Sequence, residues 1–331
     1  MPFAHPLRIA IPGGTGQVGN ILARHFSEQG HSVTVIARHP VSADWPVLAW
    51  TGEDLGPWTS ALDGADVVIN LAGRSVNCRY NAANRQEIKR SRIVTTQLVG
   101  KAIAEAKNPP RVWMNASTAT IYRHALDKPM DEFSGEIGGH EPGAPPQWAF
   151  SIDVATSWER AFFAAQTPRT RKLALRSAMT MSPDPGGVFD HLLRLVRWGL
   201  GGRSGPGTQY VSWIHDMDFA RVIEFLIARE EMEGVVNVAS PCPLTNEEFM
   251  CVLRRTYCTS YVGLPAPTWA LQLGAVFMRT EPELILKSRR VIPKKLLDAG
   301  FEFHFPNWRG ACHDLICRWR EMTGEEEPPC K

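Results

Sequence analysis

The chain has 331 residues, 44% of them hydrophobic, and a formal net charge of +2. This length suits one large domain or two, and the near-neutral charge argues against nucleic acid or a membrane surface as a partner. The seven cysteines lack CxxC spacing, so we expect reduced thiols, no metal site and a cytoplasmic location. We also expect no signal peptide, and no apolar run reaches the ~18 residues of a membrane span.

The first predicted elements are a strand at residues 7–11, a glycine loop and a helix that continues through Phe26. The loop has the spacing Gly13-x-x-Gly16-x-x-Gly19, which is typical of short-chain dehydrogenase/reductases. Glycines in such a loop allow a tight turn, close approach to a pyrophosphate, and close packing of helix on strand. The N–H groups at the helix start then bind phosphates. The alternative is an ordinary glycine turn.

The second predicted strand covers residues 32–37 and ends at Ala37, directly before Arg38. In a dinucleotide-binding fold this strand end meets the adenosine ribose, where a carboxylate favours NAD and a cation favours NADP. No Asp or Glu stands here, and the planar guanidinium of Arg38 matches phosphate oxygens. We therefore expect NADP(H) as the cofactor. The alternative is an exposed surface arginine.

Further strands and helices alternate through the first half. The pattern predicts strands at 65–71, 111–116 and 172–176, and helices at 82–106 and 150–165. The helix at 82–106 is ended by Pro109 and Pro110. Residues 123–147 are rich in proline, glycine and acidic residues and are predicted to be an active-site loop.

The second half is less regular. Its predicted elements are a helix at 189–198, a glycine-rich loop at 199–207, a helix at 218–230, a strand at 234–239 and a helix capped by Thr245 or Asn246. We predict an α/β, Rossmann-type doubly wound parallel sheet with a smaller, mainly C-terminal substrate lobe. Residues 1–180, completed by about 213–240, would form the NADP-binding domain, and residues 181–212 and 241–331 the substrate lobe.

Several separated segments resemble one family, the epimerase-like branch of the extended, or atypical, short-chain dehydrogenase/reductases, which has its own C-terminal domain (the human epimerase family protein type). The resemblance spans nearly the whole chain. It rests on residues 13–19, Asn70-Leu71-Ala72-Gly73, residues 91–96, Trp158-Glu159, residues 199–202, Ser212-Trp213-Ile214-His215, residues 237–241 and the segments 291–296 and 300–303.

The resemblance implies which residues contact the cofactor. The pyrophosphate would be surrounded by the glycine loop, the 2′-phosphate would lie at the end of the second strand, and the adenine-to-ribose path would follow the third. The implied set is Gly13, Gly14, Thr15, Gly16, Gln17, Val18, Gly19, Ala37, Arg38, Leu71, Ala72, Gly73, Glu87, Arg92 and Thr180.

Reductases of this superfamily normally carry a Tyr-x-x-x-Lys pair on one helix, where lysine lowers the pKa of tyrosine and tyrosine transfers the proton. Counting back from Glu159, the lysine position falls on Ala155 and the tyrosine position on Ser151. Neither residue can perform the standard reaction. The family branch lacks the pair as well.

Three hydroxyls remain as candidate catalytic groups, namely Ser117, Thr118 and Tyr122. Thr118 matches the strand-end Ser/Thr of sugar epimerases, and Tyr122 matches the tyrosine in their Val-Tyr-Gly turn. The alternative is that Ser117 and Thr118 satisfy backbone groups while Tyr122 lines the pocket. His215 is a further candidate proton carrier, or a residue that fixes the connection between the lobes.

Two functions therefore stay open. One is an NADP-dependent oxidoreductase or epimerase acting on a small polar, sugar-like substrate, favoured by the loops at 123–147 and 199–207. The other is a non-catalytic NADP-binding sensor or interaction protein, favoured by the absent Tyr-x-x-x-Lys pair. A homo-oligomer is compatible with both, and the sequence does not identify the substrate.

Overall fold

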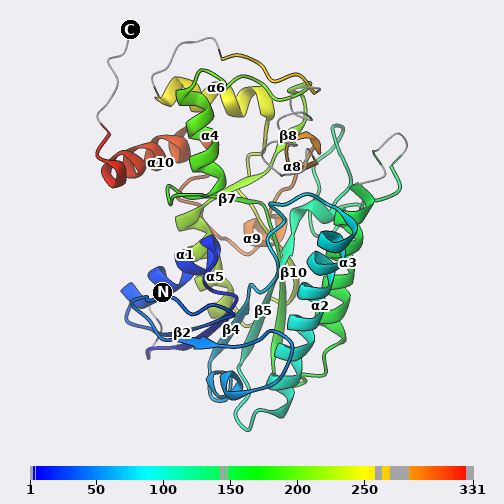
Figure 1. The fold of residues 1–331 in the computed structure, drawn as a ribbon, viewed down its shortest axis with the longest axis vertical. Coiled ribbons are helices and arrows are strands. Elements are labelled where there is room, and N and C mark those ends of the chain that lie inside the picture. The colour runs from blue at the N-terminus through cyan, green and yellow to red at the C-terminus, as the bar shows by residue number, and fades with distance from the viewer. Residues whose placement is uncertain are drawn as a thin grey trace.

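The computed structural model describes residues 3, 5–141, 145, 148–257, 263–268 and 283–325. Its centre is a seven-stranded parallel sheet in the order β10-β6-β5-β4-β1-β2-β3 (Figure 1). The strands are β1 (Arg8–Pro12), β2 (Ser32–Ala37), β3 (Val47–Ala49), β4 (Val67–Asn70), β5 (Val112–Thr118), β6 (Arg171–Ser177) and β10 (Gly234–Val238). The predicted doubly wound Rossmann-type fold is confirmed.

Helices cover both faces of this sheet. The helices α2 (Ala82–Glu105) and α3 (Trp148–Ala164) lie side by side on one face, and α1 (Gln17–Glu28) and α5 (Asp216–Ala228) on the other (Figure 1). Each buries an apolar stripe against the sheet, because strands covered on both faces are apolar throughout. Phe26 and Phe219 belong to one core, and Trp113 packs edge-on against Phe162 in the other.

The order of the strands fixes where a ligand can bind. β1 pairs with β2 on one side and with β4 on the other, so the chain reverses its direction of travel across the sheet at this point. In open α/β sheets such a switch point places the ligand at the carboxyl ends of the strands. The loops after β1, β2, β4 and β5 all lie at that edge.

A second group of elements packs above this edge (Figure 1). It contains the helices α4 (Val188–Arg197), α6 (Asn246–Tyr257), α8 (Glu283–Leu286) and α10 (Trp308–Thr323) and the short strands β7 (Met179–Met181), β8 (Tyr210–Val211), β9 (Trp213–His215) and β11 (Leu244–Thr245). Its separate core includes Phe189, Phe249 and Trp308, with Phe249 stacked on Trp308 at 4.0 Å. The helix α9 (Lys294–Asp298) packs on β10 instead, and its Leu296 belongs to the core of the sheet.

Several details differ from the sequence expectation. The strand β3 and a 3-10 turn at Pro57–Ala61 lie in a stretch for which no element was predicted. The helix α5 starts at Asp216 rather than 218, because the side chain of His215 accepts a hydrogen bond from Met217 N and caps the helix. Thr245 caps α6, as expected, with Glu248 bonding back to it. No helix within the described ranges is long and apolar enough to cross a membrane.

Candidate functional site

The loop after β1 packs tightly against the loop after β4. Gly13 has a φ of +78°, which side chains rarely adopt, and its N–H donates to Ile36 O (2.7 Å). A Cβ at this position would lie 2.5 Å from Ala72 N. Glycine is therefore required for the two loops to meet.

The other glycines serve packing and access. A Cβ on Gly19 would collide with the backbone of Gly14, so the first turn of α1 packs directly on the loop. At Gly16, the N-cap of α1, nothing lies within 4 Å of the Cβ position. No side chain caps this helix among the described residues. The first N–H groups of α1 are therefore available to an anionic ligand.

Gln17 carries a polar nitrogen without a partner. Its Nε2 is buried and makes no hydrogen bond within the described part of the chain. It lies against Gly187, the N-cap of α4, where a Cβ would collide with it. A buried amide nitrogen without an acceptor costs about 1–3 kcal/mol, so the position favours an acceptor supplied by a ligand. Thr15 is exposed and Val18 half-buried in the same loop.

The end of β2 presents an exposed cation. Ala37 is buried, whereas Arg38 is exposed and has no ion-pair partner within the described ranges. The Cδ atom of Arg38 lies 4.0 Å from the Cβ position of Gly52. The adjacent Glu53 pairs with Arg90 instead (3.0 Å), so its carboxylate does not neutralise Arg38.

The side chain of Arg92, from α2, packs against the loop after β4. Ala72 N donates to Asn70 Oδ1 (3.2 Å), and a Cβ on Gly73 would lie 3.0 Å from Arg92 Cγ. The guanidinium of Arg92 donates to the carbonyl of Arg74 (2.9 Å). Burial lowers the pKa of Arg92 to about 10. Its buried charge is thus bonded to neutral carbonyls rather than to a carboxylate.

The glycine loop, Leu71–Gly73 and Arg92 thus meet at one edge of the sheet. Glu87 instead forms an ion pair with Arg90 (3.7 Å) on the surface of α2. Thr180 is buried in β7 opposite Ile214 of β9. No hydrogen bond within the described part of the chain joins either residue to the glycine loop.

Ser117 and Thr118, at the end of β5, have different partners. Ser117 is buried, and its Oγ donates to Glu159 Oε1 (2.6 Å). Thr118 is half-buried, and its Oγ1 accepts a hydrogen bond from Thr120 N (3.1 Å) at the start of a 3-10 turn. The hydroxyl of Ser117 thus donates to a carboxylate, while that of Thr118 has no acceptor within the described residues.

Tyr122 is 2% exposed and belongs to a buried polar cluster. Its hydroxyl donates to Asn237 Oδ1 (2.9 Å) and accepts from the guanidinium of Arg176 (3.0 Å). Arg176 in turn pairs with Glu159 (2.7 Å). Burial raises the pKa of Tyr122, and Arg176 opposes this shift. The phenol is therefore protonated at neutral pH and fully bonded.

The α3 positions expected for a Tyr/Lys pair are occupied as the sequence indicates. Ala155 is fully buried. Ser151 Oγ donates to Glu283 Oε2 (2.7 Å), which comes from α8. The α3 position at which a proton-transferring tyrosine was looked for is thus bonded to α8.

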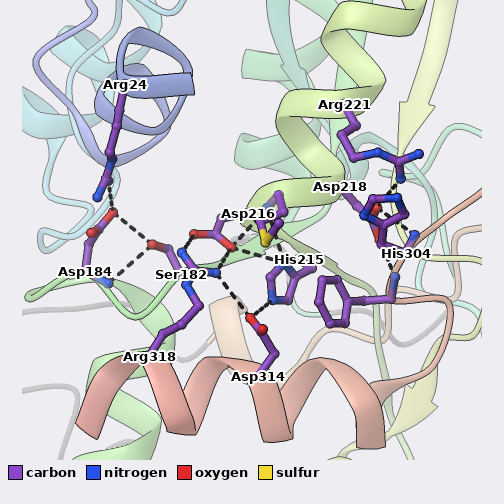
Figure 2. A network of polar contacts seen from close by, with 12 residues as sticks. Arg24, Ser182, Asp184, His215, Asp216, Asp218, Arg221, His304, Asp314 and Arg318 are labelled. Atoms are coloured by element: carbon purple, nitrogen blue, oxygen red, sulfur yellow. Dashed lines mark hydrogen bonds and ion pairs between the residues drawn. The ribbon is translucent and has the colours of Figure 1, made fainter. Parts of the chain in front are cut away.

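His215 stands at the junction between the sheet and α10, in the network of Figure 2. It is fully buried, its Nε2 lies 3.0 Å from Asp314 Oδ2, and its ring stacks on Phe305 at 3.9 Å. Burial lowers the pKa of His215, although Asp216 and Asp314 oppose the shift. A neutral ring satisfies both contacts, with Nδ1 accepting from Met217 N and Nε2–H donating to Asp314.

The surrounding carboxylates are bonded in the same manner. Arg318 of α10 donates to both oxygens of Asp216 (2.9 and 2.8 Å). Asp218 accepts from the backbone N–H groups of His304 and Phe305 (2.9 and 2.8 Å). Figure 2 shows these groups converging from α5 and α10. In this geometry His215 joins the start of α5 to α10.

The glycine-rich segment 199–207 packs on the described residues 263–268. Gly202 N donates to Leu264 O (3.2 Å), and Gly205 N donates to Ala266 O (2.8 Å). These bonds are backbone to backbone, so the segment is held by its own chain rather than presenting free N–H groups as a phosphate loop does. No cluster of three or more potential metal ligands occurs in the described ranges.

One polar segment, residues 283–291, was not predicted to belong to the site. Lys287 Nζ donates to Thr120 O (2.8 Å), and Arg289 Nε donates to Thr120 Oγ1 (3.0 Å). Both cations are buried at the carboxyl end of β5. Neither lies in a recognisable motif, and only the opposite charges of Glu283 and Lys287 four residues apart mark the segment.

These features fit a dinucleotide with a phosphorylated adenosine. The N-terminus of α1 and the unpartnered Gln17 Nε2 suit its pyrophosphate, and Arg38 suits a 2′-phosphate. A nearby carboxylate would repel that phosphate, but Glu53 is bonded to Arg90.

Two family models match the chain. The model of the NAD dependent epimerase/dehydratase family matches residues 9–239, and a domain of unknown function (DUF1731) matches residues 266–315. Among curated proteins, the bovine epimerase family protein SDR39U1 is 32% identical, covering 94% of this chain and 100% of the relative. An epimerase family protein of Staphylococcus epidermidis is 31% identical over 93% of this chain and 99% of its own length.

Solved structures give the same result. The human epimerase family protein SDR39U1, crystallised with NADPH, is 30% identical with a TM-score of 0.80, covering 93% of this chain and 99% of that one. A nucleoside-diphosphate sugar epimerase from Corynebacterium glutamicum is 25% identical with a TM-score of 0.73, covering 98% of this chain and 63% of that one.

Proposed function

Because the chain belongs to the NAD dependent epimerase/dehydratase family, we propose that it binds NADP(H) and acts as an epimerase or oxidoreductase on a small polar, sugar-like substrate. The observation that carries the proposal is the glycine loop, with open space at Gly16 and a buried, unpartnered nitrogen on Gln17 within the described residues. The human relative crystallised with NADPH supports the choice of cofactor.

Each part of the site has a role in this proposal. The N–H groups of α1 and Gln17 Nε2 hold the pyrophosphate, and Arg38 binds the 2′-phosphate as a bidentate donor. Leu71 and Ala72 line the path from adenine to ribose. The cofactor supplies or accepts a hydride at its nicotinamide when bound.

We assign proton handling to Thr118 or to a water that it orients. Its hydroxyl is half-buried at the end of β5 and has no acceptor among the described residues. Ser117 and Tyr122 were also predicted from the sequence, but their hydroxyls already donate to Glu159 and Asn237. In this proposal Ser117 and Tyr122 fix the position of the strand end. Either hydroxyl could transfer a proton directly only after its present hydrogen bond breaks.

A second function, a non-catalytic NADP-binding sensor or interaction protein, is favoured by one observation. The α3 positions that carry tyrosine and lysine in reductases hold Ser151 and Ala155, and the nearby Tyr122 hydroxyl is fully bonded. In this case NADP(H) would bind with no turnover.

The cofactor assignment is tested by titration calorimetry with NADPH and NADH. We expect Arg38→Asp to weaken NADPH by about 10- to 100-fold, because a charge-assisted bidentate contact is worth about 1.5–3 kcal/mol, and NADH much less. The control is Arg229→Asp, at the C-terminal end of α5, which changes charge equally. Equal weakening of both cofactors would remove Arg38 from this role, and no saturable binding of either would end the proposal.

The choice between the two functions is tested by NADPH absorbance across a panel of carbonyl compounds and nucleotide sugars. Turnover by the wild type that is lost in Thr118→Ala, with NADPH affinity retained, establishes an enzyme. Tight binding without turnover across the panel favours the sensor.

A further inference from the structure

The segment 283–291 reaches the edge of the sheet where the substrate would react. Glu283 accepts from Ser151, which occupies the usual tyrosine position on α3 (2.7 Å). Lys287 Nζ and Arg289 Nε both donate to Thr120, directly after β5 (2.8 and 3.0 Å). Two cations of the C-terminal lobe are thus fixed beside the strand end that carries Thr118.

Lys287 is buried without a carboxylate partner in the described part of the chain. Its side chain is 1% exposed, and its ammonium donates to one neutral carbonyl, that of Thr120. Two of its three N–H groups have no acceptor among the described residues. Lysine is almost never fully buried unless it is paired, because a buried ammonium loses its hydration.

The surrounding charges do not compensate for this burial. Burial lowers the pKa of Lys287 to about 8, and Arg289 lowers it further, while Glu283 and Glu141 oppose the shift. His124 faces the same group, and Lys287 contributes to the lowered pKa of that imidazole. Glu283 and Glu141 also accept hydrogen bonds from Ser151 and from backbone N–H groups. The two carboxylates therefore offset the burial of Lys287 only in part.

We propose that Lys287, together with Arg289, forms a binding site for an anionic group, a carboxylate or a phosphate, at the reacting end of the substrate. The anion accepts hydrogen bonds from the two remaining N–H groups of Lys287 and lies beside Thr118 and Thr120. This site narrows the substrate of the proposed function to an acidic compound, and in that sense it rests on the proposed function. Lys287 would bind the anion through charge-assisted hydrogen bonds that are shielded from water.

The test uses the full chain and two probes, inorganic phosphate and acetate, in thermal unfolding at constant ionic strength, with and without saturating NADPH. We expect the wild type to be stabilised saturably by at least one probe, and the apparent affinity of Lys287→Met to be at least about 10-fold lower. The preferred probe identifies the anion as phosphate or carboxylate. The matched control is Lys294→Met, an exposed lysine paired with Asp298, which should respond as the wild type does.

A second variant protects the test against misfolding. Lys287→Arg keeps the charge and should retain a weakened anion response. In protein labelled with ¹³C-lysine, the Cε signal of Lys287 is identified as the one that is missing from Lys287→Arg. In the wild type this signal should titrate near pH 8, and its titration midpoint should move to higher pH when the anion binds.

Three results overturn the inference: neither probe stabilises the wild type, Lys287→Met responds as the wild type does, or the Cε titration is unaffected by the anion. Anion binding at the glycine loop or Arg38 would persist in Lys287→Met and be displaced by NADPH. If NADPH itself fails to bind, the proposed function fails, whereas the anion response of the NADPH-free protein still decides this inference.

Discussion

The junction between α5 and α10 (Figure 2) and the carboxyl edge of the sheet are both rich in buried polar groups, but they differ in how those groups are bonded. At the junction, Asp216 receives two hydrogen bonds from Arg318, and Asp218 receives two from backbone N–H groups. At the edge, Gln17 Nε2 has no partner in the described ranges and Lys287 has one. Closed networks hold a fold together, whereas unfilled bonding capacity favours a ligand.

The largest expected effect breaks the junction. Arg318→Met leaves the carboxylate of Asp216, whose side chain is 4% exposed, without its bidentate partner. We expect a loss of about 2–3 kcal/mol in the free energy of unfolding, at or just below the usual range for a broken buried pair, because Arg318 itself is 31% exposed. Urea unfolding measures it.

The matched control is Arg309→Met on the same helix, where the arginine is exposed. We expect a change within about 0.5 kcal/mol there. If the two variants lose equal stability, the pair of Arg318 and Asp216 does not stabilise the contact between α10 and α5.

The second effect is a pH dependence at the edge of the sheet. Lysine titrates near 10.5 when unfolded, whereas the pKa of Lys287 in the folded protein is about 8. Between these values the unfolded state binds more protons, so stability rises with pH in this window. The burial cost is fully present below pH 8 and is relieved above it.

Relative to Lys287→Met, the wild type should therefore gain about 2 kcal/mol between pH 8 and pH 10. Chemical unfolding at several pH values measures the difference, with Lys294→Met as the control that shows no such gain. If the difference in unfolding free energy between the wild type and Lys287→Met does not change with pH, Lys287 is paired with a negative charge in solution. Without anion, we also expect Lys287→Met to be at least as stable as the wild type at pH 7.

The smallest effect concerns Tyr122, which belongs to a closed cluster although it lies near the edge. Tyr122→Phe removes the donor to Asn237, and we expect a loss of about 1–2 kcal/mol with unchanged NADPH affinity. Tyr210→Phe is the control and should be nearly neutral. If turnover is found and Tyr122→Phe abolishes it without a stability loss, Tyr122 is a proton donor and the two regions are less distinct.

The sequence by itself determined the sheet, its flanking helices and the glycine loop. These features follow from local patterns: apolar runs bounded by turns, helical spacing of apolar residues, and glycines at the positions that need a positive φ or a missing Cβ, such as Gly13. Arg38 could also be placed, because the end of the second strand has a fixed position in this fold.

Only the tertiary structure decided which polar groups bond to each other. Ser117 is bonded to Glu159, 42 residues away, and His215 to Asp314, 99 residues away. Lys287 reaches Thr120 across 167 residues. Such pairs leave no local pattern, because hydrogen bonding depends on distance in space and not on spacing along the chain. For the same physical reason the sequence identified Ser117, Thr118 and Tyr122 as candidate hydroxyls. It did not show that Ser117 and Tyr122 already donate hydrogen bonds to other side chains.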